Sequence, residues 1–149
     1  MNNAQKWYVR GGAYRLNRNP ESLDSEEKKL ANQFCKMFDD ITPISEDMRL
    51  YRGIGHGSYT DQAGSFWSTS ASEDIAKSFT REEIYKNSRG QRRARSVGEV
   101  LIIDVKPGVK VMNIGGVQRE FVIDRNAVAI ETNRVENGAT WIWITVIPA

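Results

Sequence analysis

The sequence predicts one α+β domain spanning residues 1–149, with helices early in the chain and strands late. Residues 25–39 repeat apolar side chains at helical spacing. Residues 100–147 instead contain short apolar runs separated by turn residues, the pattern of successive strands. A chain of this length is expected to form a single domain with a sizeable core, and its 40% hydrophobic and 27% charged residues are typical of a globular protein.

The first half of the chain holds one long expected helix and two expected strands. Residues 25–39 form the helix, because Leu30, Phe34 and Phe38 recur on one of its faces. Residues 49–53 are a short strand that ends in a glycine-rich stretch. Residues 65–70, rich in aromatic and hydroxyl side chains, are the second strand.

The segment after the second strand is expected to be helical. Ser70 with Glu73 matches a capping box, and Ala76, Phe79 and Ile84 continue the helical pattern. Residues 86–95 are polar and basic, so a solvated loop is expected there.

The last third changes to strands. The expected strands are residues 100–105, 110–112, 120–123, 127–134 and 140–147, with turns at 113–116, 124–126 and 136–138. Both faces of the strand at 140–147 are largely apolar, as expected for a strand covered on two sides.

Composition excludes several classes of protein. The net charge of +2 and the pI of about 8.7 are too mild to imply a nucleic-acid partner by themselves. One Cys and one His cannot form a disulfide framework, and no metal is expected. Residues 1–6 lack the apolar run of a signal peptide, and no segment is long enough to span a membrane. We expect a cytoplasmic location, in the protein's own cell or in a target cell, and no membrane partner.

Three short segments carry candidate site chemistry: Leu50-Tyr51-Arg52-Gly53, Ser68-Thr69-Ser70 and Gln118-Arg119-Glu120. An arginine such as Arg52 can bind a pyrophosphate bidentately. A carboxylate such as that of Glu120 can stabilise a sugar that becomes positively charged as a glycosidic bond breaks. Strand alternation would put Ser68 and Ser70 on one face, where they could hold Glu120. Taken singly, Arg52 and Glu120 are better explained as surface residues at strand ends.

In this order the three segments resemble the Arg, Ser-Thr-Ser and Gln-x-Glu signature of the toxin-like mono-ADP-ribosyltransferases. The resemblance implies two packed, mostly antiparallel sheets around an NAD cleft, with an N-terminal helix against one side. It implies that NAD is the substrate and is cleaved at its nicotinamide–ribose bond. Because nicotinamide leaves as a neutral molecule, one carboxylate suffices, and Glu120 is the candidate.

The resemblance also assigns roles to individual residues. It implies that Arg52 contacts an NAD phosphate, that the backbone near Gly53 contacts the nicotinamide amide, and that Arg81 is a second phosphate ligand. Phe79 is expected either to stack on nicotinamide or to be a core residue of its helix, with about equal weight. The catalytic candidates are Glu120, Gln118 and Ser68, and the NAD-binding candidates are Arg52, Gly53, Ser68, Thr69, Ser70, Phe79 and Arg81.

Gln118 bears on the acceptor. On an extended segment it would face the same side as Glu120. Family members that modify arginine have Glu at this position, and those with Gln resemble enzymes with other acceptors. The expected activity is therefore transfer of ADP-ribose to a protein side chain other than arginine, or to RNA. A bacterial toxin or effector, or a phage enzyme, fits this interpretation, and for a toxin an inhibitor or immunity protein would be a further partner.

Two alternatives remain open from the sequence. One is an NAD glycohydrolase, in which water is the main acceptor. The other is a non-enzymatic module that uses the basic residues 86–95 to bind RNA or an acidic protein.

Overall fold

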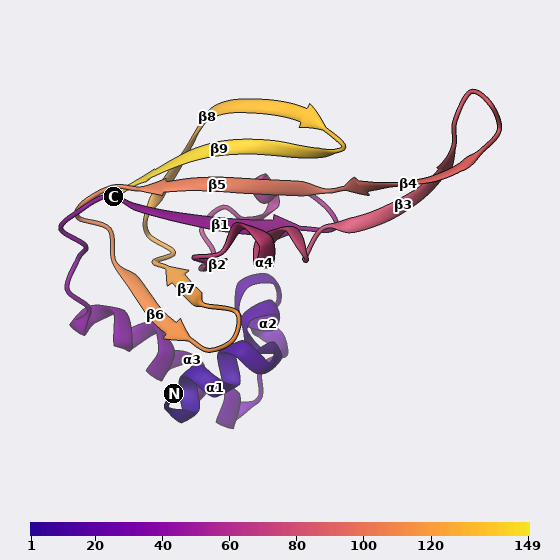
Figure 1. The fold of residues 1–149 in the computed structure, drawn as a ribbon. Helices are drawn as coiled ribbons and strands as arrows, with labels where there is room; N and C mark the ends of the chain where they lie inside the picture. Colours follow the sequence, from indigo (N-terminus) through magenta and orange to yellow (C-terminus); the bar gives the residue numbers. More distant parts are fainter.

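Seven strands form one mixed sheet, and two more form a separate hairpin, in the computed structural model, which describes residues 1–149 (Figure 1). The order in the sheet is β6-β7-β2-β1-β5-β9-β8, and the hairpin pairs β3 with β4. Every neighbouring pair is antiparallel except β5 with β9. The strands are β1 (Met48–Ile54), β2 (Trp67–Ser70), β3 (Arg81–Lys86), β4 (Arg92–Val97), β5 (Glu99–Val105), β6 (Val111–Gly115), β7 (Glu120–Ile123), β8 (Val128–Asn137) and β9 (Ala139–Ile147).

Most of the helical residues lie in the first 40 positions. The α-helices are α1 (Asn3–Trp7), α2 (Ala13–Arg18), α3 (Ser25–Met37) and α4 (Glu73–Lys77). Short π or 3-10 turns lie at Tyr8–Gly12, Pro20–Ser22, Phe38–Asp40 and Tyr59–Gln62. The expected helix at 25–39 is confirmed as α3 and the 3-10 turn that follows it. Asp24 caps α3 by accepting a hydrogen bond from the backbone N–H of Glu27. None of the helices combines the length and apolarity that crossing a bilayer requires.

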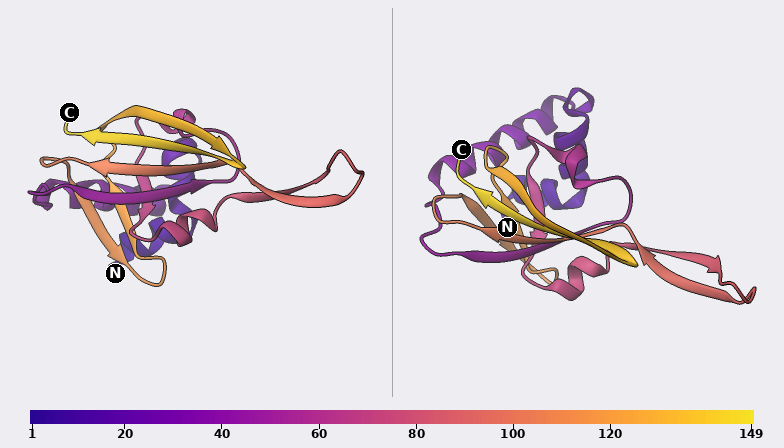
Figure 2. Two further views of the ribbon diagram at one scale, coloured as in Figure 1. Left: turned by 45° about the horizontal axis from the view of Figure 1, so that its top comes forward. Right: turned by 90° about the horizontal axis from the view of Figure 1, so that it is seen from above.

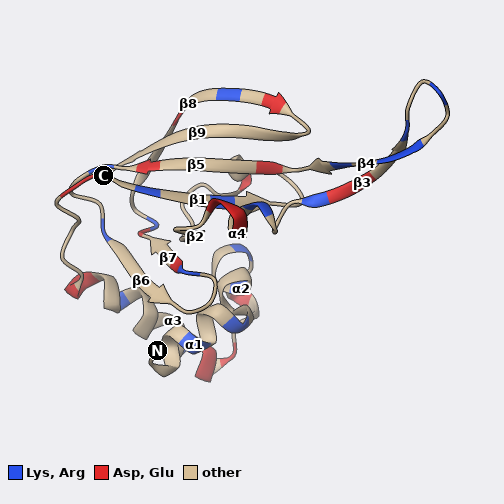
Figure 3. Ribbon diagram, viewed as in Figure 1, with Lys and Arg blue, Asp and Glu red and all other residues tan.

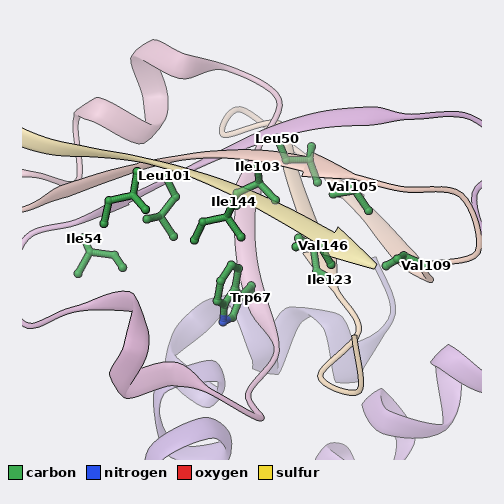
Figure 4. Packing of buried hydrophobic residues seen from close by; sticks show 11 residues of the cluster. Leu50, Ile54, Trp67, Leu101, Ile103, Val105, Val109, Ile123, Ile144 and Val146 are labelled. Carbon is green, nitrogen blue, oxygen red and sulfur yellow. The ribbon is translucent and has the colours of Figure 1, made fainter. Parts of the chain in front are cut away.

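The sheet bends sharply where β1 meets β2. These two strands share a single pairing, Tyr51 with Ser70, whereas β1 pairs with β5 along its whole length. The bend lets β6, β7 and β2 pack beneath β1, β5 and β9 across a buried cluster (Figure 4). The two expected packed sheets are therefore two halves of one hydrogen-bonded sheet. The α+β class and the mostly antiparallel pairing are confirmed.

Alternation along β2 and β7 builds a second core on the far side. Trp67 and Ile123 point into the cluster between the two halves, and their neighbours Phe66 and Val122 point to the other side. There they meet the N-terminal helices in a cluster of buried residues: Ala4, Tyr8, Phe34, Phe38, Phe66, Met112 and Val122. The molecule thus has three layers, with β6-β7-β2 as the middle one.

The helix expected after the second strand is shorter and begins later than the sequence indicates. α4 has five residues, and its N-cap is Ser72, which accepts from the N–H of Ile75. Ser70 remains in β2, so its predicted role as an N-cap is wrong. Ile84 is not helical either, because it belongs to β3.

Two further expectations are corrected by the structure. Residues 86–95, expected as a loop, are the end of β3, a turn and most of β4, and all are solvent-facing apart from half-buried Asn87. On β9, Ile142 and Ile144 are buried, but the face that carries Trp141 and Trp143 is only half-buried. Lys77 of α4 lies over the ring of Trp141, 5.1 Å from its centroid, and covers part of that face.

Candidate functional site

One pocket of about 330 Å³ lies where the N-terminal segment faces the junction of β1, β2 and α4. It contains all but one of the residues singled out from the sequence, although these come from positions 52 to 120. The predicted residues that line it are Arg52, Gly53, Ser68, Thr69, Ser70, Phe79, Gln118 and Glu120.

Arg52 is held in place by the protein through two of its three guanidinium nitrogens. Its Nε donates to Gln62 Oε1 at 3.1 Å, and its Nη1 donates to the backbone oxygen of Ser68. No buried side-chain nitrogen or oxygen lacks a hydrogen-bond partner. The remaining Nη2, which has no protein partner, is therefore not fully buried. Burial lowers the pKa of Arg52, but a guanidinium stays charged in proteins.

Glu120 is the acidic group of the pocket. Partial burial raises the pKa of its carboxyl group, because desolvation disfavours the charged form. The Ser68 hydroxyl and the positive charge of Arg52 act in the opposite direction but do not cancel the rise. The result is a carboxylate that is poorly hydrated and close to a cation, an arrangement in which its field acts strongly on any charge formed nearby.

Ser68 links Glu120 to the N-terminal segment. The hydroxyls of Ser68 and Tyr8 lie 2.9 Å apart and share a hydrogen bond. Tyr8 is fully buried, and its ring stacks on that of Phe34 with centroids 4.2 Å apart and planes 5° from parallel. Burial raises the pKa of the Tyr8 hydroxyl, which keeps it protonated and able to donate. The aromatic core thus fixes the position of Ser68.

The other two hydroxyls of the Ser-Thr-Ser segment bind backbone. Ser70 Oγ donates to the carbonyl of Gln118 at 2.7 Å, and Thr69 Oγ1 donates to the carbonyl of Phe121 at 2.7 Å. The expectation that Ser68 and Ser70 together hold the Glu120 carboxylate is therefore wrong for Ser70. Its hydroxyl instead positions the turn that carries Gln118.

Gln118 lies in that turn and not on an extended segment. Arg119, between Gln118 and Glu120, has a left-handed backbone with φ of 48°, which is uncommon for a residue other than glycine. The alternation argument for a shared side consequently fails. Gln118 and Glu120 line the same pocket because the turn brings them there.

Gly53 is required by packing. A Cβ at this position would overlap the carbonyl oxygen of Ala76 in α4 and lie 3.2 Å from Cβ of Phe79. Phe79 follows α4, lines the pocket and is 51% exposed, so it is not the core residue that one interpretation expected.

Arg81 is the predicted residue that the pocket does not include. It opens β3, and its Nε donates to the carbonyl of Gly55 at 2.9 Å.

The N-terminal segment contributes lining residues from outside the three signature segments. Val9, Gly11, Ala13 and exposed Tyr14 join Tyr8 on one wall of the pocket. The pairing of Tyr8 with Ser68 spans 60 positions, and no local pattern reveals a contact of that range. The signal that could have been used is the Gly11-Gly12 pair. Gly11 has φ of 116°, and a Cβ on Gly12 would meet the ring of Trp7, so this segment folds tightly next to Tyr8.

Comparison with known proteins gives matches at the level of structure only. No protein-family model matches the chain, and no curated protein sequence matches it. Among solved structures, exoenzyme S from Pseudomonas aeruginosa, in complex with human 14-3-3 protein beta and bound to carba-NAD, superposes with a TM-score of 0.67 at 15% identity, over 95% of this chain and 70% of that one.

Two further bacterial proteins superpose over nearly the whole chain. An ADP-ribosyltransferase from Clostridium botulinum gives a TM-score of 0.64 at 16% identity, over 97% of this chain and 84% of that one. The Vis toxin, an ADP-ribosyltransferase from Vibrio splendidus, gives 0.59 at 17% identity, over 100% and 75%. The chain therefore has the fold of the bacterial ADP-ribosyltransferase toxins. At these identities the likeness establishes the fold and leaves the activity to be argued from the site.

Proposed function

We propose that this protein is a mono-ADP-ribosyltransferase that cleaves NAD at its nicotinamide–ribose bond and transfers ADP-ribose to a macromolecule. The observation that carries the proposal is the gathering of Arg52, Ser68, Gln118 and Glu120 in one pocket, from three segments far apart in the chain. The fold shared with ADP-ribosyltransferase toxins supports it.

The pocket offers groups suited to two parts of NAD, the pyrophosphate and the nicotinamide. The Nη2 of Arg52, which has no protein partner, offers a cation for the pyrophosphate. The half-exposed ring of Phe79, next to the closely packed backbone at Gly53, offers a face on which nicotinamide can stack. In this arrangement the ribose lies between them, close to Glu120.

Bond cleavage then needs little acid–base chemistry. The bonding electrons leave with nicotinamide, whose pyridinium nitrogen becomes neutral, so no proton has to be supplied. The positive charge moves to the ribose, where the poorly hydrated Glu120 carboxylate stabilises it. Ser68, fixed by Tyr8, orients that carboxylate.

The chemistry of Gln118 is the basis on which we propose the class of ADP-ribose acceptor. An amide can donate and accept hydrogen bonds, but it cannot remove the proton of an attacking guanidinium. We therefore propose an acceptor other than arginine, either another protein side chain or RNA, in the setting of a bacterial toxin or effector or a phage enzyme.

Labelled NAD tests both the reaction and the acceptor. Purified protein is incubated with a cell lysate and NAD labelled in its adenylate, and samples are then divided between protease and nuclease. Label removed by only one of the two identifies the acceptor as protein or as nucleic acid. NAD consumption without macromolecular label would assign the protein as a glycohydrolase, and absence of any NAD consumption would overturn the enzymatic proposal.

A further inference from the structure

The β3–β4 hairpin projects far from the body of the molecule, as three views show (Figures 1 and 2). All twelve residues of the two strands are exposed except the last, Val97, which is half-buried at the base. A two-stranded ribbon buries too little apolar surface to be stable for its own sake. A surface of this shape, maintained outside the core, is suited to contact with a partner.

The hairpin concentrates positive charge (Figure 3). Residues 81–97 contain six basic and two acidic side chains and carry a net charge of +4, while the whole chain carries +2. The rest of the molecule therefore has a net charge of −2. A polyanion is attracted to the hairpin and repelled, on balance, by the remainder.

The register of the hairpin puts an aromatic ring among these charges. Tyr85 lies directly opposite Arg93, so both point to the same face. Arg95 also lies on this face, and its guanidinium is 4.9 Å from the centroid of the Tyr85 ring. The Tyr85 side chain is nevertheless 37% exposed. Lys86 and Arg92 form a basic pair on the opposite face.

We propose that the hairpin binds single-stranded nucleic acid. Five of its six basic residues are arginines, which bind phosphates bidentately and stack on bases. An exposed tyrosine on the same face adds a surface for an unpaired base. An acidic protein would satisfy the charge but would make no use of the exposed Tyr85 ring beside Arg93 and Arg95. Binding at the hairpin goes beyond the proposed enzymatic function and does not require NAD turnover.

The position of the hairpin relates this partner to the pocket. β3 begins two residues after Phe79, which lines the pocket wall. At the base of the hairpin, the Arg81 side chain is held by its hydrogen bond to the Gly55 carbonyl. A strand bound along the ribbon is thus delivered toward the mouth of the pocket.

Binding is tested with fluorescent oligouridylate and oligodeoxythymidylate of about 20 nucleotides, with duplex DNA of the same length and polyglutamate as competitors. The variant R89Q/R92Q/R93Q removes three hairpin charges. The variant K28Q/K29Q/K36Q removes three exposed charges from α3 and is its matched control.

For the hairpin variant we expect the slope of log K against log salt to fall by about 2 in magnitude, since each phosphate contact contributes about 0.7. The α3 variant should keep the wild-type slope. Tyr85→Ala should weaken single-strand binding roughly tenfold through lost stacking.

Equal losses in the two triple variants would overturn the proposal, as would tighter binding of duplex DNA or displacement of oligouridylate by polyglutamate at equal charge concentration. Nicotinamide release from NAD alone is measured in parallel and should be unchanged in both triple variants. Failure of oligonucleotide binding with normal release refutes the hairpin proposal alone, and absent release with intact binding refutes the enzymatic proposal alone.

Discussion

Replacing Glu120 by Gln should nearly abolish nicotinamide release while leaving the fold at least as stable as before. Gln keeps the size and shape of the side chain, removes its charge and replaces one acceptor oxygen by an NH2 donor. The change therefore isolates the electrostatic role that the proposed function gives to Glu120 from its contribution to packing.

The size of the effect follows from the surroundings of the carboxylate. Glu120 is partly buried, so an effective dielectric constant of about 20 applies, and two unit charges about 4 Å apart then interact by about 4 kcal/mol. Each 1.36 kcal/mol is about tenfold in rate. Loss of the carboxylate should therefore slow nicotinamide release by roughly 1,000-fold.

The stability of the fold, unlike the activity, should not fall in the Glu120→Gln variant. The carboxyl group of Glu120 has a raised pKa in the folded state, so the fold favours the protonated, neutral form even with Arg52 nearby. The stabilisation that this proton provides is complete below the unfolded-state pKa and is lost as the pH rises through the folded-state pKa. A neutral Gln avoids that loss, so the Tm of Glu120→Gln at neutral pH should equal or exceed that of the wild type.

The assay is chromatographic measurement of nicotinamide released from NAD, with Glu136→Gln, an exposed glutamate of β8, as control. In the wild-type protein the rate should fall as the pH drops through the raised pKa of Glu120, at a higher pH than for an ordinary glutamate. Release by Glu120→Gln within tenfold of wild type would refute the mechanism. A markedly lower Tm at neutral pH would refute the reasoning about desolvation.

Three further substitutions test the hydrogen bonds and packing that hold the pocket residues in place. Arg52→Lys keeps the charge but cannot reproduce the paired donors to Gln62 and Ser68, so NAD binding measured by calorimetry should weaken about tenfold or more. Tyr8→Phe removes the hydrogen bond to Ser68, and we expect a loss of about 1 kcal/mol in urea-unfolding free energy together with slower nicotinamide release. Gly53→Ala places a methyl group against the Ala76 carbonyl and should cost about 3 kcal/mol in the same unfolding measurement.

Each of these three predictions has a result that would contradict it. An unchanged NAD affinity in Arg52→Lys would remove the arginine from the phosphate site. Release at the full wild-type rate in Tyr8→Phe would show that Ser68 needs no support from the N-terminal segment. For Gly53→Ala the comparison is Gly64→Ala, whose added methyl group meets nothing within 4 Å although φ is 76°. Equal costs at the two positions would show that packing against α4 is not the reason for Gly53.

The elements that the sequence predicted well are those with strong local patterns. α3 repeats apolar residues on one face, and β5 and β7 are apolar runs bounded by turns, so each forms within a residue or two of the expected limits. The hairpin escaped prediction for the same physical reason. All but one of its strand residues are exposed, so no apolar alternation marks the strands, and it forms through its turn, where the Asn87 N–H donates to the Gln91 carbonyl.

The sequence predicted which residues form the site but not how those residues contact one another. Arg52, Ser68 and Glu120 carry a recognisable order along the chain, and the fold brings them into one pocket. The part played by Ser70 depends on where α4 begins. Ser72 replaces it as the cap, and the Ser70 hydroxyl becomes free to bind the Gln118 carbonyl. Tertiary structure decides this hydrogen bond, and it also decides the one between Tyr8 and Ser68.

The single pairing between β1 and β2 makes the width of the pocket a property of the core. Arg52 lies on one side of this seam and Ser68 on the other, and the backbone joins the two sides only at Tyr51 and Ser70. Their spacing is otherwise maintained by the hydrogen bond from Arg52 Nη1 to the Ser68 carbonyl and by side chains such as Trp67, which lies between the two halves of the sheet. Changes in the volume of those side chains would therefore adjust how closely the arginine and the carboxylate grip a substrate. Substitutions at buried residues that do not contact the ligand can therefore change how tightly the substrate is bound.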